Sequence, residues 1–252
     1  MVGFDLVILG GGSGSRYSAH HRSNHHDQPL PKQFEILENI PVFIHSLKLI
    51  SGLKGFRHAY VVMPEHHLEL ANQLVRTHCP TLANRVSAVT GGATRQHSAL
   101  NALRAIDAKG LPPERVLIHD ACRPLLTPEF LERIESHCGN PQYQSWIPVL
   151  PVTETIKEVS GDRVQRTLER AKLVRVQTPQ IFDYATLKEA AEKANMESGA
   201  IFTDDASICE FYDIPVGTFL GDHRNIKLTY DFELDTLRLF SKTQSLGEPQ
   251  CE

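Results

Sequence analysis

The stretch DLVILGGGSGSR, residues 5–16, determines how the rest of the chain is interpreted. Its first half is a continuous apolar run, which is typical of a strand buried on both faces of a sheet. Its second half places glycines at positions 10, 11, 12 and 14, just before Arg16. Glycines after a buried strand let backbone N–H groups approach a phosphate closely, because no Cβ stands in the way. A tight turn without a ligand is the alternative interpretation.

Neither of the two common nucleotide-binding fingerprints fits this loop. The dinucleotide fingerprint G-x-G-x-x-G fails in either register, because Ser15 or Tyr17 stands where its third glycine is needed. No G-K-[ST] sequence is present, so the loop is not a P-loop. We therefore expect a phosphate-binding loop of another kind.

Further apolar runs recur along the chain, with helical spacing between them. The expected strands cover residues 6–9, 59–63, 86–89, 116–118 and 146–149, and the expected helices cover 41–49, 65–78, 94–108 and 128–138. This alternation predicts a mostly parallel α/β sheet flanked by helices. Ligands of such sheets bind beyond the carboxyl ends of the strands. The glycine loop, residues 91–95 and residues 119–124 should therefore open on one edge.

Composition limits the classes of protein and partner. The 252 residues allow one main domain, and no apolar run approaches the roughly 20 residues that a membrane span needs. A net charge of −4 gives no general attraction for nucleic acid, so we expect neither a nucleic-acid nor a membrane partner. Five cysteines without a C-x-x-C pair argue against a disulfide framework and a zinc knuckle. Together with the lack of a signal-like N-terminus, they predict a cytoplasmic protein.

Residues 151–180 break the alternation of strands and helices. Polar stretches at 153–159 and 163–167 flank the turn at 160–162, which predicts a β-hairpin. A two-stranded arm alone is marginally stable in water, so we expect the hairpin to protrude and to pack on another surface, such as a second subunit.

Three charged residues near the predicted edge are candidates for chemistry. Arg16 ends the glycine loop and Lys32 follows two prolines. Two cations placed there can neutralise charge that grows during phosphoryl or nucleotidyl transfer. Asp120 ends a buried strand, where a carboxylate suits Mg²⁺. The plainer interpretations are a solvated lysine and an aspartate that caps the following turn.

Eight motifs follow one another in a fixed order between about residues 9 and 229. They are G-G-x-x-x-x-R, P-K-Q-F, G-G-x-x-R-x-x-S, H-D-A-x-R-P, P-V-x-x-T-I-K, Q-T-P-Q-x-F, T-D-x-A-S and N-I-K-x-T. This set resembles the 2-C-methyl-D-erythritol 4-phosphate cytidylyltransferases of the non-mevalonate isoprenoid route. The resemblance implies a Rossmann-like nucleotidyltransferase fold. It also implies an enzyme that transfers CMP from CTP to 2-C-methyl-D-erythritol 4-phosphate, a sugar-alcohol phosphate, and releases pyrophosphate.

The resemblance also implies roles for individual positions. Arg16 and Lys32 match the family's catalytic pair, and Asp120 matches its Mg²⁺ ligand. The positions that match the nucleotide-binding residues are Gly10, Gly11, Gly12, Gly92, Ala93, Ser98, Ala121 and Arg123. The positions that match the acceptor-binding residues are Thr155, Arg170 and Lys227. In family dimers the arm that carries Thr155 reaches the neighbouring subunit's site, so a homodimer with exchanged arms is expected.

The chain departs from the family pattern at several positions. Glycines at 10 and 11 replace the usual alanines, Ala93 replaces an acidic residue, and Cys122 replaces an alanine. The family often has a tryptophan near the position that Val174 occupies here. The insert at 18–28 holds histidines at 20, 21, 25 and 26, which suit either a polar loop over the triphosphate or a Zn²⁺ or Ni²⁺ site. The aspartates at 204 and 205 are expected to cap the helix that follows.

Three other functions stay open on the sequence. A cytidylyltransferase for ribitol 5-phosphate or another pentitol phosphate would use the same scaffold, although Arg170 within T-L-E-R favours the methylerythritol enzyme. A nucleotide-binding regulator without catalysis would suit the changes at Ala93 and Val174, whereas the retained Arg16 and Lys32 argue against it. A nicotinamide-dependent oxidoreductase is disfavoured by the failed dinucleotide fingerprint.

Overall fold

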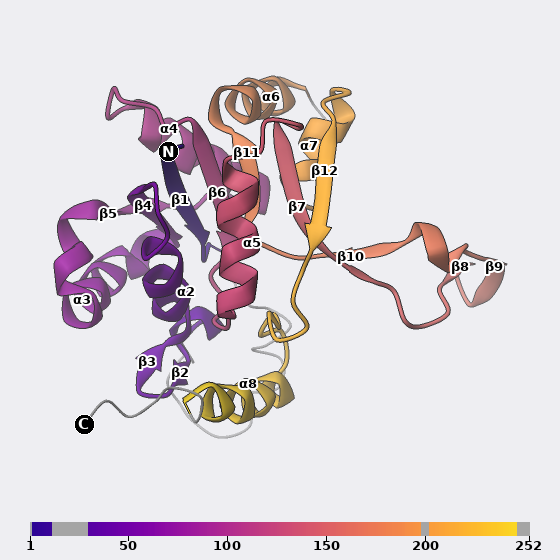
Figure 1. Ribbon diagram of the computed structural model, residues 1–252, viewed down its shortest axis with the longest axis horizontal. Coiled ribbons are helices and arrows are strands. Elements are labelled where there is room, and N and C mark those ends of the chain that lie inside the picture. The colour runs from indigo at the N-terminus through magenta and orange to yellow at the C-terminus, as the bar shows by residue number, and fades with distance from the viewer. Residues whose placement is uncertain (1, 12–29, 198–201, 246–252) are drawn as a thin grey trace.

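A central eight-stranded sheet organises the protein, and helices cover both of its faces (Figure 1). The structure is a computed structural model that describes residues 2–11, 30–197 and 202–245. The strands follow the order β10-β7-β11-β6-β1-β4-β5, and β12 pairs with β7. The sheet is mostly parallel, so the predicted fold class is confirmed.

The parallel half of the sheet is built on the first strand. Its members are β1 (Phe4–Leu9), β4 (Phe56–Met63), β5 (Val86–Thr90) and β6 (Arg115–Asp120). β1 lies between β6 and β4, with Leu6 opposite Leu117 on one side and Ala59 on the other. All six residues of β1 are buried, which explains why residues 6–9 form an apolar run instead of alternating with polar residues.

The other half of the sheet is mixed in direction. It holds β7 (Ser145–Pro151), β10 (Val174–Val176), β11 (Gln180–Asp183) and β12 (Val216–Leu220). β11 runs antiparallel to both β6 and β7, β10 is antiparallel to β7, and β12 is parallel to β7. The strand β11 therefore separates β6 from β7, which the alternation of strands and helices did not predict.

Two hydrophobic layers hold the helices on the sheet. One layer joins Leu6 and Ile8 of β1 to α2 (Val42–Ser51), α3 (Leu68–His78) and α5 (Pro128–Cys138). The opposite layer joins Val7 and Leu9 to α4 (Arg95–Asp107), α6 (Tyr184–Met196) and α7 (Ala206–Phe211). Alternate side chains of β1 thus enter opposite layers, as the geometry of a strand requires.

Capping side chains set where two of these helices begin. The hydroxyl of Thr94 accepts a hydrogen bond from the backbone N–H of His97 at the start of α4, at 3.1 Å. The hydroxyl of Thr127 accepts one from Phe130 at the start of α5, at 3.3 Å, and Pro128 fills the first position of that helix. Such caps satisfy backbone donors that have no partner inside the helix.

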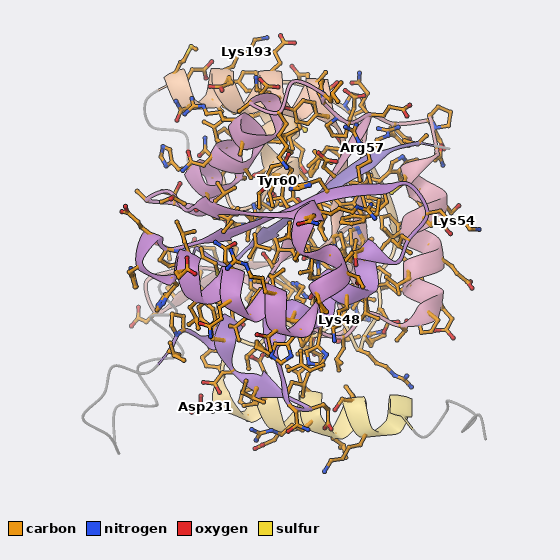
Figure 2. All side chains as sticks on the ribbon, turned by 90° about the vertical axis from the view of Figure 1, so that its left-hand side faces the viewer. Lys48, Lys54, Arg57, Tyr60, Lys193 and Asp231 are labelled. Carbon is orange, nitrogen blue, oxygen red and sulfur yellow. The ribbon has the colours of Figure 1, made fainter. Side chains whose placement is uncertain are left out.

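Short elements connect this framework. They are η1 (Lys32–Phe34), β2 (Ile36–Leu37), β3 (Ile40–Pro41), η2 (Glu65–His67), η3 (Pro80–Arg85) and η4 (Arg170–Lys172). The 15-residue helix α8 (Asp231–Ser245) follows the last strand. Figure 2 shows α8, which starts at Asp231, at the opposite end of the molecule from α6, which carries Lys193. The helix expected at 65–78 therefore starts as the 3₁₀ turn η2 and becomes α-helical only from Leu68.

The expected hairpin is present and protrudes from the sheet (Figure 1). It consists of β8 (Lys157–Ser160) paired antiparallel with β9 (Arg163–Thr167), and every residue of both strands is exposed. Val159 and Val164 lie opposite each other and keep 59% and 54% of their surface exposed. These two valines are thus apolar residues that the chain itself leaves uncovered.

None of the described helices is both long and apolar enough to cross a membrane.

Candidate active site

The ends of the parallel strands meet at one edge, as the sequence predicts. The N–H of Gly10 donates to the carbonyl oxygen of Val62 at 2.8 Å, and the N–H of Ala121 donates to that of Leu9 at 3.0 Å. These bonds fasten the loops after β1, β4 and β6 to one another. The site is therefore assembled from strand ends, where an α/β sheet usually binds its ligands.

Close approach of backbones explains the glycines of this edge. A Cβ on Gly11 would lie 3.0 Å from the hydroxyl oxygen of Ser98, and one on Gly10 would lie 2.6 Å from the sulfur of Met63. Larger residues would push the first loop away from the loop at 91–94. Gly12, Arg16 and the histidine-rich insert at 18–28 lie outside the described residues.

Ser98 shapes the loop at 91–94. Its hydroxyl accepts a hydrogen bond from the N–H of Gly92 at 3.0 Å and donates to the carbonyl oxygen of Thr94 at 2.9 Å. A Cβ on Gly92 would lie only 2.4 Å from the Cβ of His97, so this position has no room for a side chain. Ala93 is exposed at the tip of the same loop.

Lys32 is brought to the edge by its neighbour in η1. The side-chain N–H of Gln33, a residue that is 1% exposed, donates to the carbonyl oxygen of Gly10 at 2.6 Å. Burial raises the pKa of the Cys122 thiol to about 11, and the positive charge of Lys32 opposes that rise. Lys32 is therefore within electrostatic range of the loop that follows β6.

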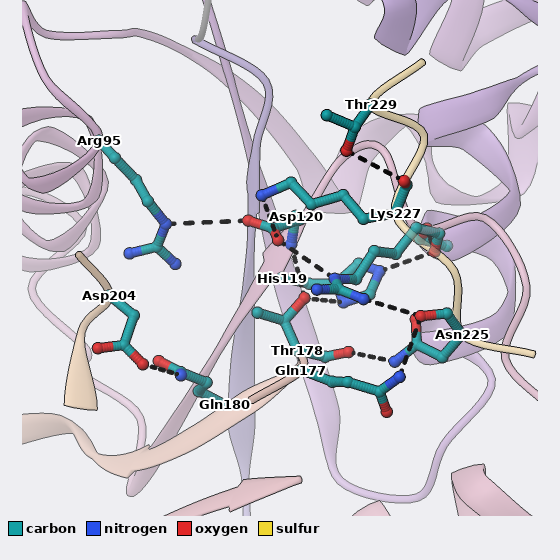
Figure 3. Close-up of polar contacts among 12 residues, drawn as sticks. Arg95, His119, Asp120, Gln177, Thr178, Gln180, Asp204, Asn225, Lys227 and Thr229 are labelled. Carbon is teal, nitrogen blue, oxygen red and sulfur yellow. Dashed lines mark hydrogen bonds and ion pairs between the residues drawn. The ribbon is translucent and has the colours of Figure 1, made fainter. Parts of the chain in front are cut away.

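Asp120 lies among three cations at the end of β6 (Figure 3). Its Oδ2 is 2.9 Å from Nζ of Lys227 and 3.2 Å from Nε of Arg123, and its Oδ1 is 3.8 Å from Nε of Arg95. Burial disfavours the charged carboxylate, but Lys227, Arg95 and Arg123 outweigh that cost and hold the pKa of Asp120 far below its usual range. The carboxylate is consequently ionised at any physiological pH.

Buried polar groups support this cluster from behind (Figure 3). The N–H of Asp120 donates to the hydroxyl of Thr178 at 3.0 Å, and that hydroxyl is 3.0 Å from Nδ1 of His119. Burial lowers the pKa of His119 to about 4, so its ring is neutral near pH 7. Arg123 donates to the carbonyl oxygen of Asn225 at 2.8 Å, and the Asn225 amide donates to that of Thr178 at 2.8 Å.

His119, Thr178 and Asn225 were not assigned roles from the sequence. They fall within the motifs H-D-A-x-R-P, Q-T-P-Q-x-F and N-I-K-x-T. These motifs supported the resemblance to the family, but they did not indicate what the individual residues do. A neutral histidine and an asparagine buried behind a charged site are groups whose partners only the fold reveals.

Two adjacent pockets flank the charged cluster and share four residues, Arg123, Val176, Gln177 and Lys227. The larger has a volume of about 410 Å³ and also contains Arg95, Asp120 and Asp204 in its wall. The smaller has a volume of about 280 Å³ and adds Arg175 and His223. Lys227 and Arg123 therefore face space large enough for a small anion or polyol on either side.

The two aspartates expected as helix caps have different roles. Asp204 does cap α7, because its Oδ1 accepts from the N–H of Ser207 at 3.0 Å. The side chain of Asp205 makes no such capping bond. It pairs instead with Arg95, at 2.6 Å between Oδ2 and Nη1. The expectation for Asp205 was wrong, because a buried carboxylate is better stabilised by a guanidinium than by one backbone N–H.

Of the three predicted acceptor-binding residues, the chain itself brings only Lys227 to Asp120. Thr155 precedes β8 and Arg170 follows β9, and both are exposed. Arg170 donates to the carbonyl oxygen of Thr153 at 2.8 Å, which braces the arm. The arm extends away from the sheet (Figure 1), so Thr155 and Arg170 lie on a different part of the chain from the cluster.

The donor set at Asp120 fits a single Mg²⁺ ion shared with a substrate. No group of three or more His, Cys, Asp or Glu side chains gathers anywhere in the described part of the chain. Mg²⁺ commonly uses only one or two carboxylates and takes its remaining ligands from water and phosphates. Oδ1 of Asp120 could be such a ligand, because both short ion pairs of this carboxylate are made by Oδ2.

The family model for 2-C-methyl-D-erythritol 4-phosphate cytidylyltransferase matches residues 5–239. The chain belongs to this family. A 2-C-methyl-D-erythritol 4-phosphate cytidylyltransferase from Bacteroides thetaiotaomicron is 33% identical over 229 residues, which cover 91% of this chain and 95% of that protein. The resemblance inferred from the eight motifs is thus confirmed.

Other cytidylyltransferase relatives carry a second enzyme. The bifunctional enzyme IspD/IspF of Bartonella bacilliformis is 35% identical over 236 residues, which cover 93% of this chain and 55% of that protein. The chain spans about half the length of this and similar bifunctional relatives. A crystal structure described as 4-diphosphocytidyl-2C-methyl-D-erythritol synthase is 26% identical, with a TM-score of 0.76 and coverage of 96% of this chain and 99% of that one.

Proposed function

We propose that the chain transfers CMP from CTP to 2-C-methyl-D-erythritol 4-phosphate and releases pyrophosphate. Membership of the cytidylyltransferase family supports this proposal. The observation that carries it is the cluster of Lys227, Arg123 and Arg95 around the ionised Asp120, at the edge where the glycine loops meet. A net acidic protein has little reason to gather cations there unless it binds anions.

The reaction brings two anions together. An oxygen of the acceptor phosphate attacks the α-phosphorus of CTP, a new P–O bond forms, and pyrophosphate leaves with the electron pair of the broken bond. The nucleophile is already ionised near neutral pH, so a general base is not required. Positive charge that is in place before the substrates meet reduces their repulsion and stabilises the charge shifted to pyrophosphate.

We assign the two substrates to different parts of the edge. The nucleotide would lie on the loops that contain Gly10, Gly11, Gly92, Ala93 and Ser98, with Ala121 and Arg123 beside it. Gly12 and Arg16 complete this assignment from the sequence. Lys32 would act on the α-phosphate from η1, and Lys227 would hold the acceptor phosphate next to it.

Asp120 is the residue that would hold Mg²⁺, through Oδ1. When bound, this ion supplies positive charge to the phosphates. Lys227 and Arg123 keep the carboxylate ionised and oriented, so its readiness to bind a cation does not depend on pH above the acid range.

We further propose that residues 1–252 act as one nucleotidyltransferase unit and that the arm at 151–180 joins two such units. In this arrangement Thr155 and Arg170 contact the acceptor in the partner's site. The exposed valines of the arm and its extension away from the sheet (Figure 1) support exchange of arms. A cytosolic location fits the cysteines of the described residues, at 79, 122, 138 and 209, which are all free and buried.

Mixing two inactive variants tests the exchange of arms. If Arg170 acts across the dimer, Arg170→Ala and Lys227→Met subunits combined in equal amounts would form mixed dimers with one intact site. After unfolding and refolding together, about a quarter of wild-type activity should return. Recovery of no activity, with mixed dimers present by mass spectrometry, would show that Arg170 does not act in the partner's site.

Release of pyrophosphate tests the activity itself. The purified chain is given CTP, Mg²⁺ and either 2-C-methyl-D-erythritol 4-phosphate or ribitol 5-phosphate, in a coupled assay. We expect the methylerythritol phosphate to be the faster acceptor by a large factor. Faster turnover of ribitol 5-phosphate would reassign the acceptor, and CTP binding without pyrophosphate release from either acceptor would favour a regulator.

A further inference from the structure

Arg95 lies between the carboxylates of Asp205 and Asp120, and it is much closer to that of Asp205. Its Nη1 is 2.6 Å from Oδ2 of Asp205, whereas its Nε is 3.8 Å from Oδ1 of Asp120. Asp205 is 1% exposed and directly precedes α7, and Arg95 is the first residue of α4. The tight pair thus draws the guanidinium toward the far side of the larger pocket.

The two oxygens of Asp120 differ as a result. Oδ2 receives both Lys227 and Arg123 at ion-pair distance, while Oδ1 has Arg95 nearby but beyond ordinary hydrogen-bond range. Nη2 of Arg95 is buried and has no hydrogen-bond partner within the described parts of the chain. The guanidinium therefore retains a donor that could turn to Oδ1 if Asp205 released it.

We propose that Asp205 is a positioning residue that holds Arg95 away from Asp120, so that Oδ1 of Asp120 stays open to a divalent cation. This inference rests on the proposed function, because it assumes that Asp120 binds the cation. Asp205 itself does not touch the reacting phosphates; it acts through the guanidinium of Arg95.

The 2.6 Å contact between the carboxylate of Asp205 and the guanidinium of Arg95 is what gives Asp205 this hold. Burial raises the pKa of Asp205, and the adjacent Arg95 opposes that rise. Arg95 thus favours the charged form of Asp205 against its burial, and the 2.6 Å contact joins a guanidinium whose side chain is 26% exposed to a carboxylate whose side chain is 2% exposed. Asparagine at 205 preserves the size of the side chain but removes the charge, so it weakens the attraction that competes with Asp120 for Arg95.

Binding of Mn²⁺ in place of Mg²⁺ tests the proposal without any need for turnover. Free Mn²⁺ is followed by its electron paramagnetic resonance signal as the enzyme is added. The same titration of Asp120→Asn measures the baseline, which is the Mn²⁺ binding that does not depend on Asp120. That baseline also removes any contribution from the histidines at 20, 21, 25 and 26. Closing the 3.8 Å gap to about 2.8 Å, at an effective dielectric constant near 20, predicts a roughly tenfold weaker Mn²⁺ affinity for Asp205→Asn.

A second substitution separates this role from a merely structural one. In the Asp205→Asn background, Arg95→Gln removes the cation that would close on Asp120, so Mn²⁺ affinity should return to within about threefold of wild type. Arg95→Gln alone should bind Mn²⁺ at least as tightly as wild type, and this result stands even if Asp205→Asn folds poorly. Glu192→Gln, which breaks the ion pair of Glu192 with Arg104 farther along α4, is the matched control and should leave Mn²⁺ binding unchanged.

Three outcomes with the variants of Asp205 and Arg95 would overturn the proposal. They are unchanged Mn²⁺ affinity in a folded Asp205→Asn, failure of Arg95→Gln to restore affinity in that background, and weaker binding by Arg95→Gln alone. If Asp120→Asn binds Mn²⁺ as well as wild type, Asp120 is not the ligand and the proposal also fails. The pyrophosphate assay would still judge the proposed function separately, since it reports transfer of CMP directly.

Discussion

Removing the charge of Lys227 is the sharpest test of how the site works. Lys227 is the cation nearest to Asp120 and lies in the wall of both pockets. Methionine at 227 keeps a similar length and flexibility without the ammonium. Asp120 would still pair with Arg123 at 3.2 Å, so we expect the fold to survive and the effect to fall on acceptor binding and transfer.

The size of the effect follows from Coulomb's law. One unit charge about 4 Å from a phosphate contributes about 1 kcal/mol in bulk water and about 4 kcal/mol near a protein surface. The side chain of Lys227 is 41% exposed, which places it between these limits. A loss of about 2–3 kcal/mol of transition-state stabilisation lowers kcat/KM for the acceptor roughly a hundredfold.

The assay is steady-state release of pyrophosphate at saturating CTP with the acceptor varied. Lys193→Met is the matched control, because Lys193 also pairs with a carboxylate, at 2.7 Å from Glu189, but lies on α6 (Figure 2) and lines neither pocket. The control should keep wild-type kinetics. A Lys227→Met enzyme whose kcat/KM for the acceptor stays within threefold of wild type would refute the assignment of Lys227.

Three further substitutions test other parts of the account. Gln33→Leu removes the buried hydrogen bond from η1 to the glycine loop, so it should lower the free energy of unfolding in urea by about 1–3 kcal/mol and should also lower kcat. If both values stay unchanged, Gln33 does not anchor the loop. Gly92→Ala places a Cβ 2.4 Å from that of His97 and should weaken CTP binding by at least tenfold in calorimetry, whereas Gly139→Ala, whose Cβ would meet nothing closer than 3.9 Å, should not. Burial raises the pKa of Asp5 from 3.8 to about 6, so ionisation of Asp5 opposes folding as pH rises from about 4 to 7. Relative to Asp5→Asn, the free energy of unfolding of the wild type should fall by about 3 kcal/mol over that interval. Parallel pH profiles of the two proteins would contradict this.

Strong local patterns made the parallel half of the fold predictable. β1, β4, β5 and β6 are runs of apolar, β-branched residues, and α5 starts and ends at the residues expected from its spacing. The short strand β11 lacked such a signal, because only Ile181 and Phe182 are apolar, and its place in the sheet is set by antiparallel pairing with β6 and β7. Its insertion depends on tertiary contacts that no local window of sequence contains.

The charged residues around the end of β6 could be named as site candidates from the sequence. Asp120, Arg123 and Lys227 were named from motifs, and the structure places Arg123 and Lys227 within ion-pair distance of Asp120. The pairing of Arg95 with Asp205 was not predicted, because the two residues are far apart in the chain and each has a common local role, one at a helix start and the other as a cap. The positions of Arg16 and Gly12 remain predictions.

A crystal structure of the chain with α,β-methylene-CTP, 2-C-methyl-D-erythritol 4-phosphate and Mg²⁺ tests the central claim most directly. We predict that the acceptor phosphate lies about 3 Å from Nζ of Lys227 and that the triphosphate rests on the glycine loops beside Lys32. A nucleotide bound away from those loops, or an acceptor phosphate more than about 6 Å from Lys227, would contradict the account.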